Sequence, residues 1–180
     1  MMTPSSGGRR RMVTALFGDG ESAERAYEIC KEHGYDVGEV NVVMAEETRK
    51  RLFSGKSEAA AELTSKKAEG GELGGPTGGR IGILVTIFAA VGAAVTVPAL
   101  GFVVAGPLAV ALAGAGAAGL AAGLIGTLGD WGIPEERVRR YEAGIRDGGV
   151  LMMVEARSDE DVRQIEQEWN AIGAREVYCC

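Results

Sequence analysis

Apolar side chains follow a strand, helix, strand pattern near the N-terminus. They alternate over residues 12–17 and again over residues 40–44, which predicts two strands, each with a buried face. Between residues 21 and 33 they recur at helical spacing, and Gly34 is a natural end for that helix. The apolar positions are Val13, Ala15 and Phe17, then Ala23, Ala26, Tyr27 and Cys30, then Val40, Val42 and Met44. The pattern predicts a βαβ unit.

The C-terminal part of the chain repeats this pattern. The string GVLMMVEA alternates as a strand, Ser158 with Asp161 resembles a capping box, and AREVY predicts a closing strand after Gly173. The helix between the strands has an apolar face of Val162, Ile165, Trp169 and Ile172. Two strands alone cannot cover a helix, whereas four strands with two helices on one side close a core. The fold class predicted is therefore α+β, a ferredoxin-like split βαβ domain interrupted by an inserted Gly/Ala-rich apolar α-helical hairpin.

The segments between the two units differ in composition. Residues 1–11 are polar and basic and predict a disordered tail, and residues 12–53 form the first half of the domain, ending in a short charged helix. Residues 54–79 are a helical and Gly-rich linker, residues 80–130 the apolar hairpin, and residues 131–180 a helix that begins at Pro134 plus the second half of the domain. Both ends of the insertion then lie near one domain.

No charged side chain occurs between residues 81 and 129. Pro98, Gly101, Gly106 and Pro107 interrupt this run near its middle and predict the turn of a helical hairpin. Small residues recur at four-residue intervals after the turn, which favours close packing of helix backbones. The candidate helix-packing residues are Ala105, Ala109, Ala113, Gly114, Ala117, Ala118, Gly119, Ala121, Ala122, Gly123 and Gly126.

Two environments fit such a hairpin. A lipid bilayer is one, because a run without charged side chains can be buried in it. Basic residues flank the run on both sides, which matches a domain in the cytoplasm, and Trp131 follows the run where an aromatic residue at the membrane interface would lie. The Gly and Ala content makes the run only modestly hydrophobic, so burial between protomers is the alternative. Trp131 then belongs to an ordinary core.

The strings VTALFGDGESAERAY, VMAEETRKRLF and GIPEERVRRYEAGIRDGGVL, together with the Gly/Ala run before the last, resemble the bacterial heat-induced YflT-type general stress proteins. The similarity covers most of residues 12–178. It implies a membrane-associated bacterial protein linked to general stress, and it supplies no catalytic residue to carry over.

Charge and candidate chemistry narrow the function further. A net charge of −6 argues against nucleic acid as a partner, and three cysteines at positions 30, 179 and 180 form no spaced set for disulfides or metal. The single histidine, His33, has no triad or metal partner in the sequence and suits the C-terminus of its helix. We therefore expect no enzyme activity, no catalytic, cofactor or metal site, and we assign no small-molecule ligand.

Together these observations predict a non-enzymatic bacterial general-stress protein. The leading hypothesis is a homo-oligomer anchored in the inner membrane through the hairpin, with its ferredoxin-like domain in the cytoplasm. The alternative is a soluble self-assembling or partner-binding cytoplasmic protein that buries the hairpin between protomers.

Overall fold

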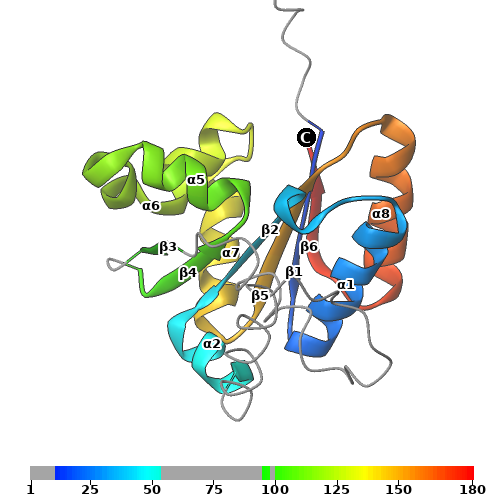
Figure 1. Ribbon diagram of the computed structural model, residues 1–180, viewed down its shortest axis with the longest axis horizontal. Coiled ribbons are helices and arrows are strands. Elements are labelled where there is room, and N and C mark those ends of the chain that lie inside the picture. The colour runs from blue at the N-terminus through cyan, green and yellow to red at the C-terminus, as the bar shows by residue number, and fades with distance from the viewer. Residues whose placement is uncertain (1–10, 54–94, 98–99) are drawn as a thin grey trace, which may run out of the picture.

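The protein is described by a computed structural model in which residues 11–53, 95–97 and 100–180 are placed. These residues form an α+β fold around a six-stranded antiparallel sheet with the order β3-β4-β2-β5-β1-β6 (Figure 1). The strands are β1 (Met12–Phe17), β2 (Val40–Ala45), β3 (Val95–Val97), β4 (Phe102–Ala105), β5 (Val150–Glu155) and β6 (Arg175–Cys179). The helices are α1 (Gly20–Glu32), the 3-10 turn η1 (Val37–Glu39), α2 (Glu46–Phe53), α5 (Pro107–Gly114), α6 (Gly116–Asp130), α7 (Glu135–Arg146) and α8 (Asp159–Ala171).

The two predicted βαβ units interleave in the sheet. Strand β5 of the second unit lies between β1 and β2 of the first, and β1 lies between β5 and β6. Leu151 of β5 is opposite Leu16 of β1 on one side and opposite Val43 of β2 on the other. Helix α1 therefore connects β1 and β2 with β5 between them, and α8 connects β5 and β6 with β1 between them.

One face of the sheet is covered by α1 and α8, as the two apolar helix faces predict (Figure 1). Trp169 of α8 is fully buried, and its ring meets that of Phe17 edge to face with centroids 5.6 Å apart. Its indole Nε1 donates to the carbonyl oxygen of Ala26 in α1 at 3.2 Å, so the buried nitrogen is satisfied. Ser158 is the N-cap of α8, and its hydroxyl accepts the Asp161 N–H, which confirms the Ser158 half of the predicted capping box.

The opposite face of the sheet is covered as well, by α7 and by α5 and α6 (Figure 1). Leu16, Val43, Leu151 and Met153 point to this side and pack against Tyr141 and its neighbours on α7. Strands β1 and β5 are buried at almost every position because both of their faces are covered. The fold is therefore three layers, with the sheet between two helical layers.

The predicted helical hairpin is wrong where the structure has strands β3 and β4. Residues 95–97 and 102–105 are strands, and β4 pairs with β2 and so extends the sheet. Both strands are rich in β-branched and aromatic side chains, which favour a pleated surface. Leu100 and Gly101 donate their N–H groups to the carbonyl oxygen of Val97, so the turn near Gly101 exists but joins strands.

The expected single helix after Pro107 is also interrupted. Helix α5 ends at Gly114, α6 begins at Gly116, and Gly123 inside α6 is non-helical with φ 65° and ψ −153°. Gly116 likewise has a positive φ of 64°, a conformation that glycine adopts without a steric penalty. The predicted tail up to residue 10, the linker over residues 54–79 and the first arm of the hairpin over residues 80–94 lie outside the described residues.

Candidate functional site

A buried asparagine holds the start of the uncharged segment on the sheet. Asn41 lies in β2 and its side-chain Oδ1 accepts the backbone N–H of Leu108 in the first turn of α5 at 2.6 Å. Its Nδ2 donates to the carbonyl oxygen of Met153 in the neighbouring strand at 3.4 Å. An N–H group at the start of a helix has no partner within the helix, so this bond satisfies a donor that burial would otherwise strand. Asn41 thus acts as a cap supplied by a distant strand.

Gly106 makes the close approach of α5 to β2 sterically feasible. It precedes Pro107 with φ 99°, and a Cβ atom at this position would lie 2.4 Å from the carbonyl oxygen of Val40. Backbone therefore packs on backbone at this point, which a larger residue would prevent. Gly106 and Pro107, predicted as part of a helical turn, instead mark the passage from β4 into α5.

The inward side of α5 and α6 belongs to the core of the molecule. Four leucines on these two helices are fully buried against Phe102, Val138 and other residues of the second face. They are Leu108, Leu112, Leu124 and Leu128. Burying one such side chain stabilises a fold by roughly 1.5–3 kcal/mol. Part of the uncharged run is therefore explained by packing within the chain.

The outward side of these helices is apolar, small and uncharged. Val110 is 63% exposed, which makes it the most exposed large hydrophobic residue that the structure describes. We call it, together with its exposed neighbours, the α5–α6 outer surface; those neighbours are Ala113, Gly114, Ala115, Gly116, Ala117, Ala118 and Gly126. Because residues 81–129 contain no charged side chain, this surface has little to attract water or an ionic partner.

The predicted helix-packing residues divide between the two sides. Ala105 lies in β4 and is buried, and Ala109 and Gly123 are buried as well. Ala113, Gly114, Ala117, Ala118 and Gly126 belong to the outer surface. The side chains at residues 119–122, which include Gly119, Ala121 and Ala122, lie outside the described part of the structure, as does Pro98. Among the described residues, the four-residue spacing therefore does not make one continuous helix face.

Trp131 directly follows α6 and packs, partly buried, against the second core, as Tyr178 and Cys180 also do. Its backbone carbonyl oxygen is 3.6 Å from the Sγ of Cys180. The position matches the reading of Trp131 as part of a domain core.

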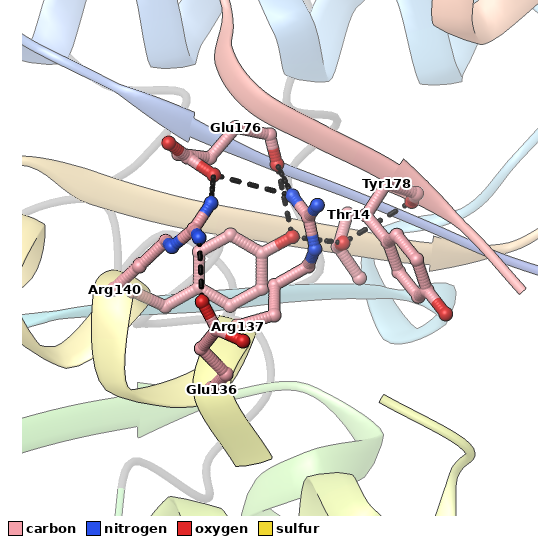
Figure 2. Close-up of polar contacts among 7 residues, drawn as sticks. Thr14, Glu136, Arg137, Arg140, Glu176 and Tyr178 are labelled. Carbon is pink, nitrogen blue, oxygen red and sulfur yellow. Dashed lines mark hydrogen bonds and ion pairs between the residues drawn. The ribbon is translucent and has the colours of Figure 1, made fainter. Parts of the chain in front are cut away.

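A polar network that sequence reasoning missed joins α7 to β6 (Figure 2). Its centre is Glu176, whose φ of 53° is the one positive value among the non-glycine residues of the described part. The pairing of β6 with β1 shifts by one residue here, so that Glu176 and Val177 together lie opposite Ala15. This is a β-bulge, which turns a peptide group out of the regular ladder.

Two hydroxyl groups connect the bulge to the interior. The Tyr141 hydroxyl donates to the backbone carbonyl oxygen of Glu176 at 3.0 Å and lies 2.5 Å from the Oγ1 of Thr14. Thr14 is fully buried, and its hydroxyl also lies 3.2 Å from the carbonyl oxygen of Tyr178. Burial is the largest cause of a raised pKa for Tyr141, so its proton stays in place to serve these contacts.

The carboxylate of Glu176 pairs with two arginines of α7. Its Oε2 is 3.2 Å from Nη1 of Arg137 and 3.6 Å from Nη1 of Arg140, and Arg140 also reaches Glu136 at 2.7 Å (Figure 2). The guanidinium of Arg137 lies over the ring of Tyr178, 4.6 Å from its centroid. Both arginines thus have carboxylate partners, and the network is structural in character.

A second polar network ties the end of α1 to the start of α8. The Tyr35 hydroxyl donates to Oδ2 of Asp161 and accepts the backbone N–H of Arg157, both at 2.9 Å. Burial raises the pKa of Tyr35 to about 12, whereas the same hydroxyl bond holds the pKa of Asp161 below its usual value. The Arg157 guanidinium lies over the Tyr35 ring and pairs with Glu39 at 2.9 Å.

The cysteines pack against the two cores, whereas the histidine contacts a carboxylate. Cys30 is fully buried in the first core; Cys179 packs on that same side of the sheet and Cys180 on the opposite side. The adjacent pair therefore cannot hold one ion between its two thiols. His33 lies at the end of α1, with Nε2 2.9 Å from a carboxylate oxygen of Glu168.

Within residues 11–53, 95–97 and 100–180, no three histidine, cysteine or acidic side chains come together as a group that could hold a metal ion. In the same part of the chain, no helix combines the length and the hydropathy that crossing a bilayer requires. No family model, curated protein or solved structure matches this chain.

Proposed function

We propose that this protein is non-enzymatic and works by self-association through the α5–α6 outer surface. The observation that carries the proposal is the exposure of Val110, at 63%, within a surface of alanine and glycine that has no charged side chain. Small side chains let two helix backbones come into contact over a broad area, which is a favourable geometry for helix pairing.

A second copy of the same chain is the partner that this surface fits best. The chain has a net charge of −6, so two copies repel each other except where both present a neutral surface. A surface that meets itself across a twofold axis needs only to complement its own shape, and a flat Gly/Ala surface does so.

Burial of the inward leucines of α5 and α6 favours this proposal over anchoring in lipid. Asn41 and Gly106 fix α5 against the sheet, so the segment already has a partner within the chain. We therefore propose an assembly that forms in the cytoplasm, with the inner membrane as the competing location that the experiment below tests.

We further propose that the protein has a ferredoxin-like domain and acts in the bacterial general stress response. The order β6-β1-β5-β2, with α1 and α8 on one face, supports a ferredoxin-like domain to which β3, β4, α5 and α6 are added. The resemblance to YflT-type proteins supports a role in bacterial general stress.

The test is the oligomeric state of the full chain by sedimentation velocity across a wide concentration range, with and without detergent. We expect a detergent-independent oligomer for the natural sequence. Val110→Glu and Ala117→Glu place a charge on the exposed surface without disturbing the core, and each should shift the chain to monomers. Gln167→Glu adds the same charge on the exposed side of α8 and should leave the oligomer unchanged.

Two results would overturn the proposal. One is a natural chain that stays monomeric at every concentration. The other is flotation with phosphatidylethanolamine–phosphatidylglycerol vesicles that Val110→Glu abolishes while the oligomeric state stays the same, because that result assigns the surface to lipid.

A further inference from the structure

Strand β6 is an edge of the described sheet, and its last residues are suited to pairing. Only β1 pairs with it, on one side, while Val177, Tyr178 and Cys179 are partly exposed and uncharged. An edge strand presents backbone N–H and carbonyl groups that can bind a strand of another molecule, and natural proteins block such edges with bulges and charges. The question is what protects this edge.

The Glu176 bulge changes the direction of the backbone at the start of this edge. Because Glu176 and Val177 share one partner, Ala15, the strand is not straight over these two residues. The carbonyl oxygen of Glu176 is turned toward α7, where the Tyr141 hydroxyl donates to it at 3.0 Å and Nη1 of Arg137 lies 3.5 Å away. That carbonyl is therefore occupied by the helical layer and unavailable to an incoming strand.

The residue type at the bulge is informative. Glycine would adopt a φ of 53° freely, whereas a glutamate is strained there. Glycine has no carboxylate, however, and the pairs with Arg137 and Arg140 need one. A charged residue in a conformation that favours glycine is accounted for if its side chain fixes the bulge to α7.

We propose that the Glu176 bulge, fixed to α7 by Arg137, Arg140 and Tyr141, is an edge guard that keeps β6 from pairing with β6 of a second copy. The occupant it excludes is a second copy because the Val177–Tyr178–Cys179 stretch is short, apolar and uncharged, and antiparallel pairing of two such stretches about Tyr178 brings no like charges together. This inference is independent of the proposed function. That proposal concerns α5 and α6, which follow β4 near the opposite end of the strand order from β6.

Deletion of Glu176 tests the guard directly. Tyr178 pairs with Thr14 and Arg175 with Leu16, so removing one residue between them leaves Val177 opposite Ala15 in a regular ladder. The deletion is made in the Val110→Glu background, which silences association through the α5–α6 outer surface. We expect sedimentation velocity to show at least a tenfold stronger self-association than in the Val110→Glu chain, with slower hydrogen exchange at residues 177–179.

Two further variants in the same background keep the test decisive. Glu176→Gly adopts the bulge conformation without strain but removes the carboxylate that Arg137 and Arg140 hold, so it should associate more strongly than Val110→Glu alone and less strongly than the deletion. The pair Arg137→Gln and Arg140→Gln removes both cations that hold the carboxylate and should strengthen association several-fold, and this pair decides the matter if the deletion does not fold. A folded deletion variant that stays monomeric, or a pair of substitutions without effect on association, would overturn the proposal.

Discussion

The side-chain oxygen of Asn41 accepts the backbone N–H of Leu108 at 2.6 Å, across 67 residues of sequence. Both groups are buried, and the amide nitrogen of Asn41 is occupied by Met153 at 3.4 Å. A single side chain therefore joins the central sheet to the first turn of α5. Packing of leucine side chains is not directional, whereas this hydrogen bond requires one position of α5 on the sheet. The contact therefore fixes where the uncharged segment attaches.

Asn41→Ala should destabilise the protein by about 1–3 kcal/mol, because it leaves the Leu108 N–H buried without an acceptor. The measurement is urea unfolding followed by circular dichroism, extrapolated to zero denaturant. Asn170→Ala is the matched control, because its side chain bonds the Glu166 carbonyl oxygen on the exposed surface and its loss should cost less than about 0.5 kcal/mol. Equal effects of the two substitutions would contradict the assigned role of Asn41.

Gly106→Ala should also loosen α5 from the sheet, for a steric reason. A Cβ atom would lie 2.4 Å from the Val40 carbonyl oxygen, and the φ of 99° disfavours any side chain. We expect a loss of at least about 2 kcal/mol in the free energy of unfolding. Gly114→Ala in the same helix meets no atom within 4 Å and should be neutral or stabilising by up to about 1 kcal/mol. A tolerated Gly106→Ala would show that α5 does not approach β2 this closely.

The first core could be predicted from sequence because its signals are local. The alternation of Val13, Ala15 and Phe17 and the spacing of Ile165 and Trp169 identify the buried faces that the structure confirms. Period and caps depend on neighbouring residues only, so one sequence is enough to find them.

The second core was missed although its signal was present. Leu16, Val43 and Met153 occupy the positions between the predicted core residues, so β1, β2 and β5 are apolar on both faces. A strand that is apolar at nearly every position indicates a sheet covered on both sides. The polar exceptions, Thr14 and Asn41, are buried with partners on α7 and α5, which no local pattern reveals.

Strands β3 and β4 were predicted as parts of a helical hairpin for a related reason. Absence of charge is common to lipid-facing helices and to segments inside a core, so hydropathy alone does not separate them. The β-branched residues around Gly101 were the available sign of the β3 and β4 strands. The Glu176 bulge had no such sign, because its conformation depends on Arg137 and Tyr141, more than thirty residues away.

Stability should fall between about pH 10 and pH 12 in a way that Tyr35 partly controls. The pKa of Tyr35 is raised to about 12 in the folded chain, chiefly by burial, so above pH 10 the unfolded chain releases this proton first. The unfolded state then binds fewer protons than the folded state, and stability decreases as pH rises. Thermal unfolding measured from pH 9 to pH 12 should show this decrease.

Tyr35→Phe should flatten that part of the profile while lowering stability at neutral pH, since the bonds to Asp161 and Arg157 are lost. A residual slope should remain, because burial also raises the pKa of Tyr27 and of Tyr141. Tyr178→Phe is the control, because the Tyr178 hydroxyl makes no hydrogen bond within the part of the chain that the structure describes. An unchanged slope in Tyr35→Phe would refute the assignment.

The thiol of Cys179 should be slow to react although it is near the end of the chain. Burial is the main cause that raises its pKa to about 11, and the nearby carboxylate of Glu166 raises it further. Because the thiolate is the nucleophile, a pKa of about 11 in place of about 9 lowers the reactive fraction at pH 8 by about a hundredfold. Iodoacetamide labelling followed by tandem mass spectrometry should therefore be about that much slower in the folded chain than in the same chain unfolded in urea. Cys30, fully buried and with a pKa of about 12, should react more slowly still.

Cys179 and Cys180 pack on opposite sides of the sheet, so a trivalent arsenical that needs two adjacent thiols should bind only after unfolding. Rapid labelling of Cys179 or arsenical binding to the folded chain would mean that β6 opens at its end.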